Sequence, residues 1–399
     1  MLNSISLDYI TLVVSALLLL FALTTPWLNG FFHKPEIPED SEDTSSPEDA
    51  ERTGPLGNSN HSGVPLSIIL TPYKNAYELE HNLPLLLQQD YPAGYEVIVV
   101  VWKGDSETED VLKRFADDPH LYTTYVPDSS RYMSRKKLGI TLGVKAAKND
   151  WFVLTDIVCQ PASTQWLSRM AQHCDDKHDI VIGYTAYDDA TSAYRRFERT
   201  HTNLYLLHED MKGTPYRHNG SNLLVRKSVF LDGDGFRGNL KYIRGEYDFT
   251  VNKYATSNNT AVELHPDSWM IEQEPADKTW LSKHLFYMES RRHLSRSWRH
   301  RARYNLDQWA LHLNYLLIVA ALAFSIITER WLLTVVACIA LLLTLILRTH
   351  IALQTLRMLR EDISWWKIVP FEISLFWHHV GYLRHYHRAN KTDFISHKI

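Results

Sequence analysis

The sequence predicts an α/β protein whose mostly parallel sheet is attached to a membrane by apolar helices. Two observations carry this prediction: short β-type segments alternate with helical patterns between residues 65 and 186, and three long apolar stretches lie outside that region. At 399 residues the chain exceeds the usual size of one domain, so we expect one large domain with additional segments.

The alternating region predicts βαβ units. Candidate strands are residues 65–70, 95–102, 121–126, 151–156 and 179–186, and the helical patterns between them are 75–89, 107–116, 134–148 and 162–174. Such alternation indicates a parallel sheet covered on both faces. Ligands bind beyond the carboxyl ends of strands in these sheets, so the residues that follow the strands are candidates for a site. They include Pro72, Tyr73, Lys103, Asp105 and Asp156.

The apolar stretches predict three membrane spans, at residues 9–28, 309–327 and 331–347. The first has no Lys or Arg before it and no small-residue cleavage site after it, which favours an uncleaved anchor over a signal peptide. Three residues separate the other two, so they form a hairpin with both ends on one side. Arginines cluster on both sides of this hairpin, which predicts a cytoplasmic large domain and C-terminus and an outside N-terminus.

Composition divides the chain further. The expected division is an anchor (1–30), an acidic linker (31–63), an α/β domain (64–278), an Arg-rich interfacial helix (279–306), the hairpin (307–348) and a C-terminal interfacial region (349–399). The linker is rich in Ser, Pro and Gly and should be disordered. Residues 363–386 are aromatic but interrupted by charges, which favours a helix on the membrane surface over a fourth span. Three cysteines provide no disulfide framework, and the net charge of −4 indicates no nucleic-acid partner.

Four blocks carry a resemblance to a known family. They are, in chain order, PLSIILTPYKNAYELEHNLPLLLQQDYPAGYEVIVVV (65–101), RKKLGITLGVKAAKNDWFVLTDIVCQPASTQWL (135–167), GTPYRHNGSNLLVRKSVFLDGDGF (213–236) and RGEYDFTVNKYA (244–255). Together they resemble family 2 glycosyltransferases of the GT-A fold. The resemblance extends over roughly residues 65 to 295 and implies a membrane-anchored GT-A domain, which would be the catalytic one.

The resemblance also implies the chemistry. It suggests inverting transfer of a sugar from a nucleotide-diphosphate donor, with UDP the expected nucleotide, to a lipid-linked or surface-glycan acceptor. Membrane lipids and polysaccharide-assembly proteins are the other partners it suggests. Because the departing diphosphate is strongly negative, a divalent cation or fixed cationic groups must stabilise it. We therefore expect Mg²⁺ or Mn²⁺ at Asp156, the first acid of the family's D-x-D motif.

The resemblance assigns further residues by position. Asp248 matches the family's catalytic base, and Glu246 is the natural substitute. His218, Asn219 and Asn222 match the acceptor side. Donor or nucleotide contacts are implied for Pro72, Tyr73, Asn75, Lys103, Asp105, Lys137, Asp156 and Arg292.

Three positions depart from the family pattern. Val158 replaces the second acid of D-x-D, which should weaken metal binding without abolishing it, because Mg²⁺ often uses only one or two carboxylates. Trp102 and Lys103 stand where a polar D-D-x-S run is usual. The sequence ESRRH at 289–293 replaces Q-x-x-R-W, which argues against processive polymer synthesis.

Plainer interpretations remain open beside these. Asp156 could cap a turn, and the acids of the GEYD sequence could mark an ordinary helix start. His218 could be structural, and the arginine series could be a stripe that meets anionic lipid. For the whole protein, the alternative is a non-catalytic GT-A-like membrane subunit that binds or assembles polysaccharide machinery.

Overall fold

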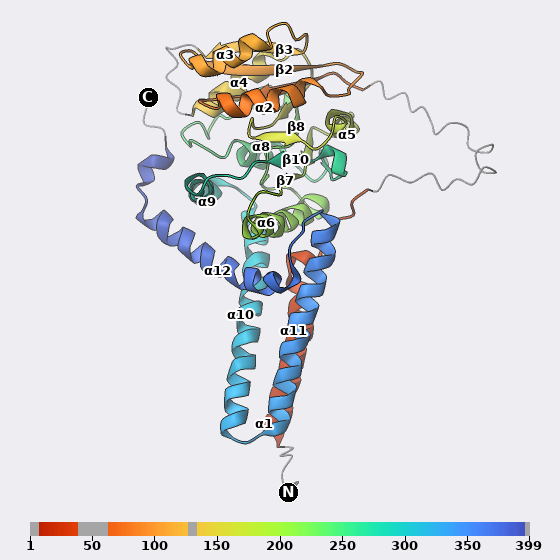
Figure 1. Cartoon of the computed structure of the whole chain (residues 1–399), viewed down its shortest axis with the longest axis vertical. Helices are drawn as coiled ribbons and strands as arrows, with labels where there is room; N and C mark the ends of the chain where they lie inside the picture. Colours follow the sequence, from red (N-terminus) through yellow and green to blue (C-terminus); the bar gives the residue numbers. More distant parts are fainter. Residues whose placement is uncertain (1–7, 39–62, 127–133, 396–399) are drawn as a thin grey trace, which may run out of the picture. The chain divides into compact units, whose positions relative to one another are not determined.

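The computed structural model describes residues 8–38, 63–126 and 134–395. The chain forms two compact units, which we describe separately (Figure 1). The α/β unit comprises Glu36–Thr191, Glu209–Ser295 and Arg388–Ile399, and the helical unit comprises Met1–Pro35, Ser192–His208 and Arg296–His387. Most of the expected linker at 31–63 lies outside the described residues.

A seven-stranded sheet forms the centre of the α/β unit. Its order is β3 (Leu121–Val126), β2 (Tyr95–Trp102), β1 (Leu66–Leu70), β4 (Trp151–Leu154), β8 (Leu223–Arg226), β6 (Ile180–Gly183) and β9 (Thr260–Glu263). Only β8 runs antiparallel to its neighbours. The prediction of a mostly parallel sheet is therefore confirmed.

A second, three-stranded sheet corrects one expected strand. The predicted strand at 179–186 divides into β6, in the large sheet, and β7 (Thr185–Tyr187), in the small one. In the small sheet, β10 (Met270–Glu272) pairs with β7 and with β5 (Cys159–Pro161). The chain therefore leaves one sheet at Gly183 and enters the other at Thr185.

The large sheet is covered on both faces, as the parallel pattern predicts. Alternate residues of each strand point to opposite faces, so Val97 and Val99 pack with α2 (Ala76–Leu87), while Ile98 and Val100 pack with α4 (Arg135–Ala146). Because a Cβ on Gly143 of α4 would lie 2.6 Å from the Ile69 side chain, glycine there permits close packing on β1. The other helices of the unit are α3 (Ser106–Arg114), α5 (Trp166–Ala171), α7 (Lys227–Asp232), α8 (Glu246–Tyr254), α9 (Asp277–Ser290) and the short η3 (Pro266–Ser268), η4 (Arg291–His293) and η5 (Lys391–Phe394).

The last described residues belong to the α/β unit, whereas the sequence places all of 349–399 in an interfacial region. The amide of Ile243 donates to the carbonyl of Phe394 (3.1 Å), and Ile395 forms a β-bridge with Tyr242. The Phe394 ring also meets that of Phe286 and is almost wholly buried. The C-terminal residues thereby brace the segment that precedes α8.

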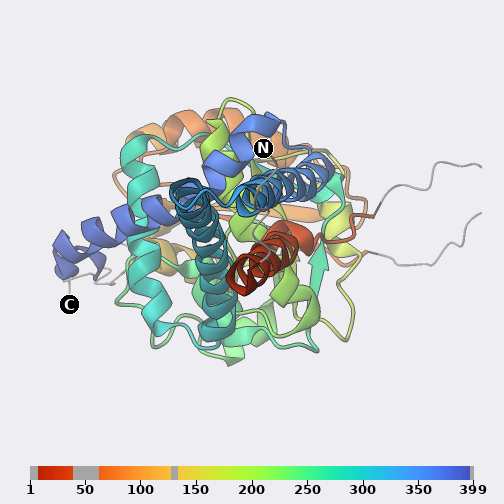
Figure 2. The same cartoon turned by 90° about the horizontal axis from the view of Figure 1, so that it is seen from below.

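The helical unit contains three helices long and apolar enough to cross a membrane: α1 (Tyr9–Thr24, continued by η1, Thr25–Leu28), α10 (Ser297–Ile327) and α11 (Trp331–Met358). They lie side by side (Figures 1 and 2) and pack through small and branched residues such as Ala22, Ala321 and Ala337. Arg330, in the turn between α10 and α11, bonds Asp8 and Thr11 at the start of α1. The start of α1 and the hairpin turn therefore share one end of the bundle.

The Arg-rich segment differs from the expected interfacial helix at 279–306. Its first part forms α9 and η4, and its second part is the beginning of α10, which continues without a break into the apolar span. The helix α12 (Trp365–Arg388) is not among the three candidate spans, and within the helical unit it runs across the axis of α10 and α11 (Figure 1). It leaves Trp365, Trp366 and Trp377 exposed, as suits a helix on a membrane surface.

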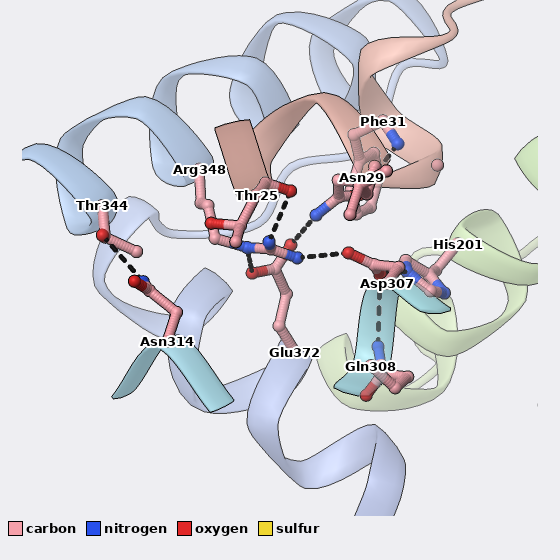
Figure 3. A network of polar contacts seen from close by, with 12 residues as sticks. Thr25, Asn29, Phe31, His201, Asp307, Gln308, Asn314, Thr344, Arg348 and Glu372 are labelled. Atoms are coloured by element: carbon pink, nitrogen blue, oxygen red, sulfur yellow. Dashed lines mark hydrogen bonds and ion pairs between the residues drawn. The ribbon is translucent and has the colours of Figure 1, made fainter. Parts of the chain in front are cut away.

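A buried polar network joins the elements of the helical unit (Figure 3). Arg348 of α11 donates to Glu372 of α12 (2.8 Å), to Asp307 of α10 (2.9 Å) and to the Thr25 carbonyl at the end of α1 (3.2 Å). Asn29, which precedes η2 (Gly30–Phe32), also bonds Glu372. Burial raises the pKa of Glu372 despite the charge of Arg348. One guanidinium thus holds together four segments that are far apart in the sequence.

His201 of α6 (Ala193–Lys212) lies beside this network. Its Nε2 is 3.9 Å from an Asp307 oxygen, and Tyr205 one turn later donates to the same oxygen at 3.1 Å. Burial lowers the pKa of His201 to about 4, although Asp307 opposes that shift, so the ring is neutral at pH 7. Arg348 is therefore the principal positive charge facing the two carboxylates.

Replacing Arg348 with Leu is expected to destabilise the helical unit, because it leaves Asp307 and Glu372 buried without their shared cation. Removing one partner of a buried ion pair costs about 3–5 kcal/mol. Thermal unfolding of detergent-solubilised protein, followed by size-exclusion recovery, measures the loss. The triple variant Arg348→Leu, Asp307→Asn, Glu372→Gln should regain stability, and a single variant as stable as wild type would contradict the role given to this network.

Candidate functional site

The strand order reverses between β1 and β4, where a parallel sheet forms a crevice at its carboxyl edge. From β1 the sheet continues through β2 and β3 on one side and through β4 on the other. Tyr73 follows β1, and Asp156 follows β4, so both lie at this edge. Ligands of open α/β sheets bind at such a reversal. The structure therefore places the sequence-derived candidates where the topology favours a site.

An ion-pair cluster occupies this edge. Lys136, from the first turn of α4, bonds Asp156, and its Nζ lies 2.9 Å from Oε1 of Glu246 at the start of α8. Burial alone would raise the pKa of Asp156, but the charge and hydrogen bond of Lys136 lower it to about 2. The same ammonium outweighs burial at Glu246 and lowers its pKa. Both carboxylates are therefore ionised and share one cation.

The two acids of the GEYD sequence lie in the first turn of α8. Gly245 precedes them at φ +90°, a conformation that favours glycine, and both Glu246 and Asp248 are buried. Asp248 Oδ1 lies 3.5 Å from Nε of Arg217, whose guanidinium stacks 3.8 Å from the centre of the Tyr287 ring. Burial nevertheless raises the pKa of Asp248 to about 6, with Arg217 opposing the shift and Glu246 adding to it.

These two acids therefore differ in proton affinity. Glu246 is held ionised by Lys136, whereas burial raises the pKa of Asp248 to about 6, which suits a group that takes and returns a proton. Oε2 of Glu246 is buried and has no hydrogen-bond partner among the described residues. The site thus holds one carboxylate fixed by a cation and another able to accept a proton.

Lys137 occupies a different environment from the one expected of a donor-binding residue. It is wholly buried, and its Nζ donates to the carbonyls of Asn239 (2.8 Å), Tyr242 (2.7 Å) and Arg244 (3.2 Å). Burial lowers its pKa to about 8. Consecutive helix residues point about 100° apart. Lys137 therefore holds the segment that leads into α8, while Lys136 faces the carboxylates.

The ends of β1 and β2 are joined by polar and cation–π contacts. Oδ2 of Asp105 accepts from the amide of Lys74 at 2.8 Å, so Asp105 fixes the turn after β1. The Arg135 guanidinium lies 4.6 Å from the Tyr73 ring centre and 5.4 Å from that of Trp102. Trp102, which breaks the family's polar pattern, therefore has a cationic partner at this edge.

The other donor-side candidates lie around this turn. Pro72 is buried, Asn75 caps α2 without a side-chain hydrogen bond, and Lys103 is exposed in the turn after β2. Arg292 is exposed on η4. The ring of the next residue, His293, stacks on the Tyr242 ring, with their centres 4.3 Å apart.

The acceptor-side candidates separate into two kinds. Asn222 is wholly buried; it donates to the carbonyls of Tyr184 and Ser268 and accepts from the Trp166 indole (3.0 Å), so its side chain bonds only to the protein. Asn219 accepts from Arg217 at 2.7 Å. His218 is buried beside Tyr247, with ring centres 6.3 Å apart. His218 and Asn219 therefore lie near the two acids, whereas Asn222 has a structural position.

Several charged residues of the site were not identified from the sequence. Lys136 and Arg135 belong to the same R-K-K run as Lys137, and Arg244 immediately precedes the GEYD sequence. The charges of Arg244 and of Lys283, which also bonds Glu272, add to the lowering of the Asp156 pKa. The run of basic residues at the start of a helix was the available signal, but it does not tell which side chain faces the site.

The residues present fit a divalent metal poorly. Val158 packs against the core of the sheet, so it leaves no oxygen where the second acid would stand. Asp156, the expected ligand, is already bonded by an ammonium group. In the part of the chain that the structure describes, no group of three or more His, Cys, Asp or Glu side chains is arranged to hold a metal.

Comparison with known proteins finds similarity in structure but not in sequence. No family profile matches the chain, and no curated protein sequence matches it. Among solved structures, the mannosyltransferase PcManGT from Pyrobaculum calidifontis, in complex with GDP-Man and Mn²⁺, is 14% identical; the match covers 85% of this chain and 97% of that one with a TM-score of 0.48.

A second similar structure is S. aureus TarS 1-349 in complex with UDP-GlcNAc. It is 13% identical, and the match covers 62% of this chain and 66% of that chain with a TM-score of 0.40. The same TarS fragment with UDP gives a TM-score of 0.39 at 14% identity, covering 55% of this chain and 63% of that one. Similarities at this level identify neither a donor nor an acceptor for the present chain.

Replacing Lys137 with Met should destabilise the α/β unit, because methionine fills the same apolar space but leaves three buried carbonyls without a donor. We expect a loss of roughly 3 kcal/mol, since each unsatisfied buried acceptor costs about 1–3 kcal/mol. Chemical denaturation of the solubilised protein measures it. Lys145→Met, at an exposed position on the same helix, is the matched control; equal stability of the two variants would refute the structural position of Lys137.

Proposed function

We propose that the protein is an inverting glycosyltransferase of the GT-A fold that moves a sugar from a nucleotide-diphosphate donor, UDP-linked by expectation, to a lipid-linked or surface-glycan acceptor. The observation that carries this proposal is the position of a proton-accepting acid, Asp248, beside a cluster of charged groups at one sheet edge. In that cluster Lys136 pairs with Asp156 and Glu246. Contacts between residues of the four resembling blocks support it: Arg135 lies over the Tyr73 ring, Lys136 pairs with Glu246, and Arg217 lies beside Asp248. The reversal of strand order also supports a ligand there.

The transfer would proceed by a single displacement. The acceptor hydroxyl oxygen attacks the anomeric carbon and forms the new glycosidic bond, while its proton passes to the carboxylate of Asp248. The bond from the anomeric carbon to the phosphate oxygen breaks, and the nucleoside diphosphate leaves with that electron pair. Fixed cations stabilise the charge that develops on the leaving group. Lys136, Arg244 and Lys283 are the cations whose charges act on Asp156.

Membrane attachment supports an acceptor that is itself anchored in lipid. Among the described residues, three helices are long and apolar enough to span a bilayer, and α12 exposes tryptophans typical of a membrane surface. A lipid-linked acceptor keeps its apolar part in the bilayer while its polar head reaches a water-exposed site. We place that site on the cytoplasmic side, because arginines flank both ends of the hairpin.

The second candidate function is a non-catalytic GT-A-like membrane subunit. Val158 in place of the second acid, and the fully internal bonding of Asn222, are the observations that favour it. Binding without turnover of any nucleotide sugar would support this candidate over the first.

Asp248→Asn is expected to lower transfer by about 10²–10⁴-fold, because the amide cannot accept the acceptor's proton. Release of nucleotide from UDP-, GDP- and dTDP-sugars, with membrane extracts supplying acceptors, is the measurement. Asp110→Asn, which changes an exposed acid paired with Lys113 on α3, is the matched control. Equal turnover by the two variants would exclude Asp248 as the base.

The pH dependence of kcat/KM should show an acidic limb near pH 6. The base works only when ionised, and the pKa of Asp248 is raised to about 6, so activity falls as pH drops through that value. Because the charge of Glu246 contributes to this rise, Glu246→Gln should move the limb to lower pH. If Glu246 were the base instead, this variant would be inactive at every pH.

A further inference from the structure

We infer that Lys136 takes the place of the divalent metal at the donor site, so that nucleotide binding by this chain does not require a metal ion. The inference rests on the proposed function and concerns the same site. It starts from the position of one side chain: the Lys136 ammonium bonds the Asp156 carboxylate and lies 2.9 Å from that of Glu246. A cation bound between the two acids would occupy the same position.

The charges of the site support a lysine better than an added metal ion. Asp156 and Glu246 contribute two negative charges, and Lys136 and the nearby Arg244 contribute two positive ones. A divalent ion at Asp156 would stand within a few ångströms of the ammonium, where it would be repelled strongly because it carries two positive charges. The ion would have to displace Lys136 first.

The oxygen ligands that a metal needs are also few. Mg²⁺ and Mn²⁺ prefer oxygen ligands, and here the second acid position is Val158, whose side chain packs with the sheet core. The backbone carbonyl of Val158 accepts from the amide of Gln273 at 3.1 Å and so is used within the fold. The carboxylates that remain here, Asp156 and Glu246, already share the Lys136 ammonium.

Lys136 is well placed to meet a diphosphate. An ammonium group has three N–H donors, and Asp156 and Glu246 use two of them, which leaves one for a phosphate oxygen. The Lys136 side chain is about one-fifth exposed, so part of it borders solvent at the sheet edge. Lys137, fixed to three carbonyls, holds both α4 and the segment before Glu246, and this keeps Lys136 in position before a ligand arrives.

Binding of UDP, GDP and dTDP to the full-length protein in nanodiscs, measured by calorimetry with EDTA and then with excess MnCl₂, tests the inference. At least one nucleotide should bind with a Kd that differs by less than about twofold between the two conditions. A site that requires a metal would instead lose at least about tenfold in affinity when EDTA is present, as expected for the loss of one charge-assisted contact. Binding only in the presence of Mn²⁺ would overturn the inference and leave the proposed function standing. No binding in either condition would overturn both.

Variants test the lysine itself. Lys136→Gln should weaken nucleotide binding by about tenfold or more, because it removes a hydrogen bond from a charged group to the phosphate. Lys145→Gln, on the exposed face of α4, should leave nucleotide binding unchanged. Thermal unfolding of both variants shows that they are folded. Unaltered binding by folded Lys136→Gln would overturn the role of Lys136.

A gain of metal binding provides an independent readout. The double variant Lys136→Gln, Val158→Asp restores the second acid and removes the resident cation, so its nucleotide affinity should rise with Mn²⁺. Electron paramagnetic resonance of Mn²⁺ should show immobilised metal in the nucleotide-bound double variant and free metal in the nucleotide-bound wild type. Immobilised metal in the wild type at the same concentrations would contradict the inference.

Discussion

The ion pairs of Lys136 with Asp156 and Glu246 are the interaction on which the candidate site depends. They bring together the start of α4, the end of β4 and the start of α8, which are separated by up to 110 residues of sequence. The next residue, Lys137, bonds the carbonyls of the segment that enters α8. Two consecutive lysines thus perform two tasks, because the helix turns their side chains in different directions: one organises the acids, and the other supports the backbone that carries them.

The helical unit uses the same physical arrangement for a different purpose. Arg348 lies between Asp307 and Glu372 as Lys136 lies between its two acids, and both cations join segments that are distant in the chain. The difference is exposure: the Arg348 network is wholly buried, whereas Lys136 and Asp156 border solvent. A sealed cluster can only hold helices together, while a cluster that borders solvent can exchange partners with a ligand. This difference is why we assign structure to one and function to the other.

Much of the architecture could be predicted from local patterns. Strands β1 to β4, the helices between them and the three apolar helices could be predicted because each segment has its own run of apolar residues or its own apolar periodicity. The expected strand at 179–186 was wrong in one respect, because its division between two sheets depends on β9 and β10, which come some 80 residues later. The start of α10 at Ser297 was likewise hidden, since its charged first turns and its apolar span look like separate segments.

For the site, local sequence patterns identify the acids that follow β4 and begin α8, because Asp156, Glu246 and Asp248 stand at the ends of elements with clear signatures. Which basic residue meets these acids depends on how the chain folds. The choice between Lys136 and Lys137, the internal bonding of Asn222 and the burial of Arg348 all depend on partners contributed by distant segments. Hydrophobic periodicity depends on residues that are close in sequence, whereas the residue that pairs with a charged side chain depends on which segments are close in space.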